Sequence, residues 1–157
     1  MYQHIMVPLD GSELAECVLP HVEMLAKSCQ IPKVTLIRVA TPLRLYSDLR
    51  HSGIEEFMNS EVVQQIENDN LKLADEYLLK QVLRLKGKGI EAKAEVVSGV
   101  VTDELISYAE KNGVDLVVIA THGRSGIGRW LMGSTAERIL KTSKVPVLMV
   151  RPTGCAQ

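Results

Sequence analysis

Five short apolar segments, separated by amphipathic ones, are the feature that most constrains the fold of this 157-residue chain. The short segments are rich in β-branched residues and almost continuously apolar, as expected of strands buried on both faces of a parallel sheet. Alternation of such strands with helices predicts an α/β fold with three layers and right-handed crossovers. The predicted strands are Ile5–Leu9, Val34–Val39, Ala92–Val97, Leu116–Ala120 and Val147–Val150.

Apolar residues repeat at helical spacing between the predicted strands. Pro20 lies inside the first helical pattern, so we expect that helix to be kinked or divided there. Gly113 is expected to end the third helix as the residue after the C-cap. The predicted buried faces comprise Leu14, Val18, Val22 and Leu25 in the first helix, Ile66, Leu73, Tyr77, Val82 and Leu85 in the second, long helix, and Leu105, Ile106 and Ala109 in the third.

Charge and aromatic content exclude several kinds of partner. The chain has 18 Lys and Arg residues against 19 Asp and Glu residues, a formal net charge of −1, so no overall field attracts nucleic acid or a membrane. An aromatic content of 4% also argues against a surface that stacks on bases. The apolar runs are too short to span a bilayer, and the first residues lack the regions of a signal peptide. We therefore expect one domain over residues 1–157, without nucleic-acid or membrane partners.

The three cysteines indicate the compartment. Cys17, Cys29 and Cys155 are odd in number and widely spaced, without a Cys-x-x-Cys pair. Such a pattern argues against a disulfide framework and favours the reducing cytoplasm.

A glycine-rich segment after the fourth predicted strand favours phosphate binding. Gly123, Gly126 and Gly128 lie in it, and Gly133–Thr135 opens the next helix. Glycines let backbone N–H groups approach an anion closely, and a helix N-terminus adds unpaired donors. Glycines can also simply turn the chain, but three of them followed by Gly-Ser-Thr at the carboxyl end of a strand favour a ligand site. The spacing matches neither a Walker A loop nor a dinucleotide fingerprint.

Two further segments allow both a structural and a functional interpretation. Asp10 follows the first strand, where its carboxylate could accept hydrogen bonds from ribose hydroxyls or hold a metal; alternatively, Asp10 or Ser12 caps the next helix. Ser134 and Glu137 have the spacing of a capping box, and the Ser134 hydroxyl could also bind a phosphate oxygen. Residues 41–60 form a polar insertion that could be a lid, a partner surface or a loop.

The histidines do not indicate a metal site. His4, His21 and His51 have no ligand spacing, and no motif pairs His122 with a Ser or Cys nucleophile. Arg124 follows Gly123 and could reach a terminal phosphate. We therefore expect no catalytic residue and no dedicated metal site, although Asp10 could contact Mg²⁺ carried by a nucleotide.

Over almost its whole length the chain resembles the universal stress protein family. The family pattern Gly-x2-Gly-x9-Gly-Ser/Thr is matched from Ala120, which replaces the first glycine, through Gly123 to Gly133-Ser134. Ile5–Ser12, with the sequence Ile-Met-Val-Pro-Leu-Asp-Gly-Ser, and the closing Val145–Val150 also resemble the family.

This resemblance implies a fold, a ligand and a set of contacts. The fold is a five-stranded parallel sheet of order 3-2-1-4-5, of the adenine nucleotide alpha hydrolase-like type, usually in a homodimer, and the ligand is ATP. By position, Pro8, Leu9, Asp10 and Val39 would lie near the adenine and ribose, Ile119, Ala120, Gly123, Gly133, Ser134 and Thr135 would surround the ribose and phosphates, and His122, Arg124 and Ser125 share the same loop.

We therefore expect an ATP-binding universal stress protein that acts as a nucleotide-dependent regulator or stress-protective protein. Two alternatives stay open: a slow ATP hydrolase or transferase that uses the same pocket, and an interaction protein without nucleotide. The glycine loop contains no Lys and no general base aimed at a terminal phosphate, which disfavours fast phosphoryl transfer. Pro146 favours an edge position for Val147–Val150, so we expect a homodimer through this strand. Its protein partners cannot be named from sequence.

Overall fold

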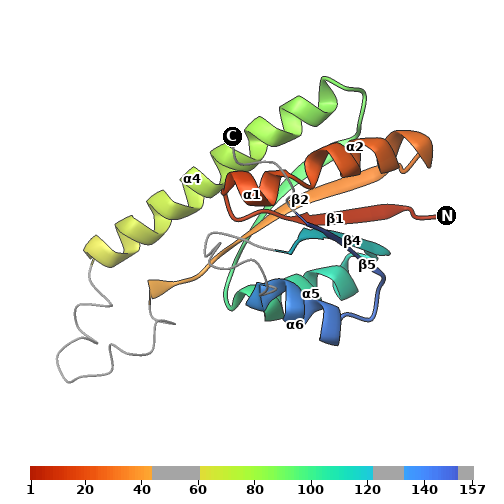
Figure 1. Cartoon of the computed structure of the whole chain (residues 1–157). Helices are drawn as coiled ribbons and strands as arrows, with labels where there is room; N and C mark the ends of the chain where they lie inside the picture. The colour runs from red at the N-terminus through yellow and green to blue at the C-terminus, as the bar shows by residue number, and fades with distance from the viewer. Residues whose placement is uncertain (44–60, 122–132, 152–157) are drawn as a thin grey trace.

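A parallel sheet of five strands organises the part of the chain that the computed structural model describes, residues 1–43, 61–121 and 133–151. The strand order is β3-β2-β1-β4-β5 and every neighbouring pair runs parallel, which confirms the predicted topology. The elements follow one another as β1 (His4–Pro8), α1 (Glu13–Glu16), α2 (Leu19–Ser28), β2 (Lys33–Ala40), α4 (Glu61–Lys86), β3 (Ala92–Ser98), α5 (Val101–Lys111), β4 (Leu116–Ala120), α6 (Ser134–Thr142) and β5 (Val147–Val150) (Figure 1).

Helices cover both faces of the sheet and produce the predicted three layers. In Figure 1, α1, α2 and α4 lie on one side of the strands, and α5 and α6 lie on the other. Alternate residues of the strands feed the two resulting cores, because successive side chains of a strand point to opposite faces. Ile5 and Val7 of β1 belong to the first core, with α1, α2 and α4, whereas Met6 belongs to the second, with α5 and α6.

The proline and glycine predictions for the helices are confirmed. The first helical pattern is divided into α1 and α2, and Pro20 occupies the first turn of α2, where its missing N–H costs no hydrogen bond. Helix α5 ends at a C-cap Asn112, and Gly113 follows with a φ of 63°. That left-handed conformation is the one glycine adopts without steric cost.

The predicted buried face of α4 is partly wrong. Val82 and Leu85 are buried as expected and Tyr77 packs against the first core, but Ile66 is 43% exposed and Leu73 is 61% exposed. The face that packs on β2 and β3 runs instead through Val63, Ala74, Leu78 and Gln81. This helix carries apolar residues on two sides, so its periodicity alone does not identify the buried one.

Within the described ranges, neither α4 nor any other helix has the length and apolar character needed to cross a membrane.

Two of the cysteines lie in the described residues and differ in state. Cys29 is a free thiol packed against the first core. Cys17, between α1 and α2, is disulfide-bonded, which the sequence analysis did not predict. An odd cysteine count argues against a framework of several bridges, and it leaves a single bridge possible.

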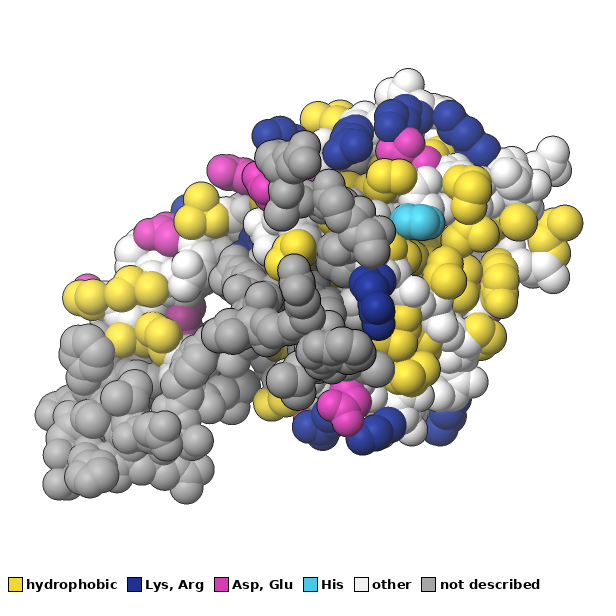
Figure 2. Space-filling model, in the orientation of Figure 1, with side chains coloured by type: hydrophobic (Ala, Val, Ile, Leu, Met, Phe, Trp, Pro, Cys, Tyr) yellow, Lys and Arg dark blue, Asp and Glu magenta, His cyan; other side chains and the backbone are white. Residues whose placement is uncertain are grey.

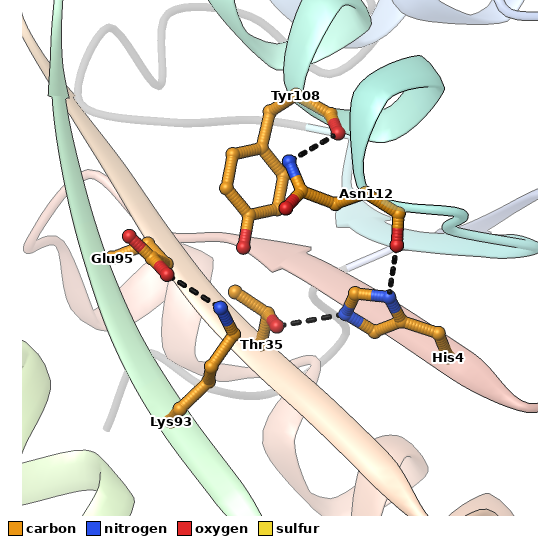
Figure 3. A network of polar contacts seen from close by, with 6 residues as sticks. All are labelled: His4, Thr35, Lys93, Glu95, Tyr108 and Asn112. Carbon is orange, nitrogen blue, oxygen red and sulfur yellow. Dashed lines mark hydrogen bonds and ion pairs between the residues drawn. The ribbon is translucent and has the colours of Figure 1, made fainter.

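A buried histidine joins β1 to its surroundings near the amino ends of the strands (Figure 3). His4 is 3% exposed, and its Nδ1 lies 3.1 Å from the carbonyl oxygen of Asn112. Its Nε2 lies 2.8 Å from Thr35 Oγ1. Because a carbonyl can only accept, Nδ1 carries the proton of the neutral ring and Nε2 accepts from the Thr35 hydroxyl. Burial, aided by the nearby cations Lys33 and Lys93, lowers the pKa of His4 below its ordinary value of 6.5, against the opposing effects of the Asn112 hydrogen bond and Asp115.

We expect this histidine to make the fold sensitive to acid. Between the lowered pKa of the folded state and the ordinary pKa, the unfolded chain binds a proton that the folded chain does not, so acidification favours unfolding. The free energy of unfolding should fall as the pH is lowered from about 7.5 to about 5.5. His4 should contribute at most about 1.4 kcal/mol per pH unit to that fall. Urea titrations at both pH values should show a smaller change for His4→Gln than for the wild type. His21→Gln, at an exposed position, is the matched control, and equal pH dependence in wild type and His4→Gln would contradict the assignment.

Candidate functional site

A cavity of about 280 Å³ opens where the carboxyl ends of β1, β2 and β4 meet the first turns of α5 and α6. Parallel strands present their carboxyl ends at one edge, and open α/β sheets bind ligands there. The volume is close to the lower end of typical ligand cavities, about 300 Å³. Its walls are formed by Pro8, Leu9, Asp10, Ala15, Ile37, Val39, Val101, Leu105, Ile119, Ala120, Thr121, Gly133, Ser134, Thr135 and Ala136.

Every predicted site residue within the described ranges lines this cavity. Pro8, Leu9 and Asp10 come from the end of β1, Val39 from β2, and Ile119 and Ala120 from β4. Gly133–Thr135 line it from the start of α6. His122, Gly123, Arg124 and Ser125 lie outside the described residues. The structure therefore brings together segments that are more than a hundred residues apart in the chain.

The cavity is lined by both apolar and polar groups. Its apolar wall comprises Leu9, directly after β1, Val39 of β2, Leu105 of α5 and Ile119 of β4. A flat, apolar ring system is the kind of group that such a wall binds. The polar groups are the carboxylate of Asp10 and the hydroxyls of Thr121, Ser134 and Thr135. The cavity thus suits a ligand that combines an apolar ring with hydrogen-bonding groups.

The turn after β1 decides which residue caps the following helix. Ser12 is the N-cap of α1, and its Oγ accepts a hydrogen bond of 3.1 Å from the Ala15 N–H. Asp10 Oδ1 in turn accepts from the Ser12 N–H at 2.9 Å and from the Ser12 hydroxyl at 2.6 Å. These bonds hold the Asp10 carboxylate at the cavity wall. Ser12 is therefore the cap, and Asp10 is oriented by it.

Helix α4 braces this turn from behind. Glu16 of α1 accepts hydrogen bonds from the Tyr77 hydroxyl at 3.0 Å and from the Gln81 amide at 3.2 Å. The Arg38 guanidinium lies over the Tyr77 ring, 5.5 Å from its centroid. Burial, together with the charge of Glu16, raises the pKa of the Tyr77 hydroxyl well above its ordinary range, so this group stays a donor. The polar cluster fixes α1, and with it the segment that carries Asp10.

The start of α6 is attached to the end of β4. The Gly133 N–H donates to the Thr121 carbonyl at 2.6 Å, and the Glu137 N–H donates to the Gly133 carbonyl at 2.9 Å as the first bond of the helix. The N–H groups of Ser134, Thr135 and Ala136 precede that bond, so they have no acceptor within the helix. This end of α6 therefore directs backbone donors toward the cavity that the same residues line.

The predicted capping box at α6 is wrong. Gly133 is the N-cap and makes no side-chain cap, so Ser134 is the first helical residue rather than the cap. Glu137 pairs with Lys141 at 2.6 Å, and this hydrogen bond lowers the pKa of the Glu137 carboxyl. The Ser134 hydroxyl is consequently not used for capping, which strengthens its assignment to the cavity.

A second cavity of about 340 Å³ adjoins the first, and Val101, Ser134 and Thr135 line both. Arg138, one turn further along α6, contributes a cation to the second cavity. Its guanidinium donates to Asp103 Oδ1 at 3.0 Å, and both side chains are more than half exposed. An arginine has five N–H donors, so this single bond leaves several for another anion.

Some lining residues were missed by the sequence analysis. Ile37 stands two positions before Val39, and the period of two in a strand could have identified it. Val101 and Leu105 are four residues apart on α5, so the helical period could have paired them once the first was known. Ala15, Thr121, Ala136 and Arg138 carry no signal in one sequence, because only the fold brings them to this edge.

No metal site is apparent in the described parts of the chain, since these contain no group of three or more His, Cys, Asp or Glu side chains placed to share an ion. Asp10 is the only carboxylate lining the first cavity among the described residues.

Comparison with known sequences identifies a family. Residues 1–151 match the family model described as the universal stress protein family. Universal stress protein MJ0577 of Methanocaldococcus jannaschii is 29% identical over 161 residues, covering 96% of each chain. Universal stress protein G of Escherichia coli O157:H7 is 30% identical over 159 residues, covering 96% of this chain and all of the relative.

Solved structures agree with that result. The structure of MJ0577 superposes with a TM-score of 0.81 at 30% identity and covers 98% of both chains. A universal stress protein family protein of Arabidopsis thaliana, solved with AMP bound, has a TM-score of 0.63 at 15% identity and covers 97% of this chain and 93% of that one. A universal stress protein in complex with cAMP has a TM-score of 0.60 at 22% identity, covering 97% of this chain and 98% of that one. At these lower identities the likeness is one of fold.

Proposed function

The chain belongs to the universal stress protein family, and from this premise we propose that it binds ATP in the first cavity and acts as a nucleotide-dependent regulator or stress-protective protein. The observation that carries the proposal is the convergence of the motif residues. Asp10, Gly133, Ser134 and Thr135, which belong to separate motifs in the sequence, line one cavity at the carboxyl edge of the sheet.

The chemistry of the cavity supports an adenine nucleotide. The apolar wall receives the base, and the Asp10 carboxylate, which lines the same cavity, suits hydrogen bonds from ribose hydroxyls. The N–H groups at the start of α6, which have no acceptor within the helix, and the Ser134 and Thr135 hydroxyls suit phosphate oxygens. Relatives of the same fold have been solved with AMP and with cAMP, which supports the same class of ligand for this chain.

A triphosphate is favoured over a monophosphate by the second cavity. It begins at Ser134 and Thr135, where the first phosphate would lie, and it extends the site toward Arg138. The additional volume and the cation suit further phosphate groups, because guanidinium donors match phosphate oxygens in geometry and charge. Mg²⁺ would be held by these phosphates together with Asp10.

Analysis of the purified protein separates this proposal from a nucleotide-free interaction protein. The protein is denatured, and the supernatant is separated by chromatography against ATP, ADP, AMP and cAMP. ATP in the supernatant, or ATP binding by the stripped protein at micromolar concentration, supports the proposal. A protein that neither carries nor binds an adenine nucleotide would instead be an interaction protein.

Gly133→Val should abolish ATP binding in a folded protein. Gly133 has φ −57° and ψ 139°, a conformation open to any residue, and its N–H bond to Thr121 needs no glycine. A β-branched side chain would instead fill space at the entrance of α6 that the phosphates need. We expect calorimetric affinity for ATP to fall at least about tenfold, or about 1.4 kcal/mol, with an unchanged thermal melt. Gly133→Ala, with only a methyl group, should lose less. Unchanged affinity in a folded Gly133→Val protein would refute the phosphate assignment.

Hydrolysis should be slow compared with binding. The inferred phosphate ligands are mainly backbone N–H groups and hydroxyls, which stabilise the ground state and the transition state to a similar degree. Fast phosphoryl transfer requires an oriented nucleophile and cations at the terminal phosphate. We expect steady-state phosphate release, with Mg²⁺ and saturating ATP, far below the ~10 s⁻¹ typical of enzymes. Turnover near that value, lost in Asp10→Ala or His122→Ala, would place the protein among ATP hydrolases.

We further propose a homodimer through β5, which is an edge strand of the sheet. The side chains of Val147 and Met149 pack on the second core, whereas Leu148 is 38% exposed. Leu148→Glu should therefore disturb the edge without opening the core, and should lower the assembled mass measured by light scattering by removing association through β5. Leu140→Glu, on the outer side of α6 and 47% exposed, is the matched control. A monomeric wild type at micromolar concentration, or an unchanged mass for Leu148→Glu, would exclude this interface.

A further inference from the structure

The outer face of α4 carries large apolar side chains exposed to solvent. Val62 is 59% exposed, Ile66 43%, Leu73 61% and Leu83 69%. They lie on the side of the helix opposite Ala74, Leu78 and Leu85, which pack on the sheet. Figure 1 shows α4 reaching past the strands, and Figure 2 shows hydrophobic side chains exposed beside acidic ones on that part of the surface.

These residues follow a heptad spacing. Steps of alternately four and three residues lead from Val62 to Leu83 through positions that are all exposed. This spacing is the one that aligns side chains along a seam between two packed helices. We call this set the α4 seam: Val62, Ile66, Asp69, Leu73, Glu76, Lys80 and Leu83.

We propose that the α4 seam binds the same seam of a second copy of the chain, with the two helices antiparallel. Packing of two seams would cover the apolar side chains that the fold leaves exposed. The charged positions of the seam determine the direction. A parallel pair in register would place Asp69 on Asp69, Glu76 on Glu76 and Lys80 on Lys80, three repulsive layers.

The antiparallel arrangement removes those three like-charge layers. Ile66 then lies opposite Leu83 of the other copy, and Asp69 lies opposite its Lys80. Leu73 faces Glu76 of the other copy. The Leu73 side chains of the two copies are offset by three residues, about 4.5 Å along the helix axis, so that they also meet. Because the contact is two-fold symmetric, each unlike pair occurs twice.

Charges outside the seam favour the same direction. Outside the seam, the first half of α4 holds Glu61 and Glu67, whereas its last turns hold Arg84 and Lys86. An antiparallel partner sets the acidic half of one helix beside the basic half of the other, and it also opposes the two helix dipoles.

The α4 seam is separate from the edge proposed for the β5 contact. Helix α4 packs on β2 and β3, and β3 is the edge strand at the other end of the sheet from β5. A copy can use both surfaces, since neither covers the other. Two different two-fold contacts generate assemblies larger than a dimer.

A charge exchange tests the proposal. Sedimentation equilibrium is performed on the full chain carrying Leu148→Glu, so that association through β5 does not contribute. In this background we expect a monomer–dimer equilibrium that is weakened at least about tenfold by Asp69→Lys and by Lys80→Asp, each of which creates like-charge layers. The double variant Asp69→Lys/Lys80→Asp restores unlike pairs and should recover the parent affinity.

The control is Asp75→Lys, an equal change of charge at an exposed position of α4 outside the seam, which should leave the equilibrium unchanged. Circular dichroism establishes that each variant is folded. Three results would overturn the proposal: a monomeric Leu148→Glu background at high micromolar concentration, a double variant no stronger than the single ones, or an effect of Asp75→Lys as large as that of Asp69→Lys. None of these readouts depends on nucleotide, so a failure of the ATP proposal would remain distinguishable.

Discussion

The pairing of β1 with both of its neighbours is the constraint from which the rest of the structure follows. The strand pairs with β2 on one side and with β4 on the other, always in parallel. Parallel pairing brings the carboxyl ends of the three strands to one edge, and it requires crossover helices that bury both faces. The cavity, its apolar wall and the direction of the α6 donors all result from that arrangement. A site of this kind needs few specialised side chains, because the backbone supplies much of its chemistry.

Much of the fold could be predicted from sequence because the sheet is buried on both faces. Strands such as Leu116–Ala120 have no solvent-facing side, so their apolar runs stand out from the surrounding pattern. Pro20 and Gly113 gave correct boundaries, since each imposes a backbone geometry through its own covalent structure. Predictions that rest on covalent constraints of this kind are independent of tertiary context.

The errors occurred where two arrangements satisfy the same local pattern. Apolar residues on two sides of α4 made Leu73 and Ala74 equally plausible as core, and only packing against β2 and β3 decides between them. At α6, both Gly133 and Ser134 can serve as an N-cap. The bond from the Gly133 N–H to Thr121 selects Gly133, and that contact spans twelve positions, beyond the reach of local sequence rules. The positions of the cavity could be predicted by motif, whereas partners such as Leu105 and Arg138 depend on how the helices pack.

Helix α4 links the two proposals physically. Its inner side braces α1 through Tyr77 and Gln81, which hold Glu16, and α1 follows the turn that carries Asp10. Its outer side is the α4 seam.

A contact between seams can influence the cavity only if it favours one position of α4 over another. A partner that binds both positions of α4 equally well shifts no equilibrium between them. Any such coupling must be reciprocal, so a nucleotide that tightens the bracing of Asp10 would strengthen the α4 contact by the same factor. The Tyr77–Glu16–Gln81 cluster is a polar connection between the inner side of α4 and α1 through which such coupling would pass.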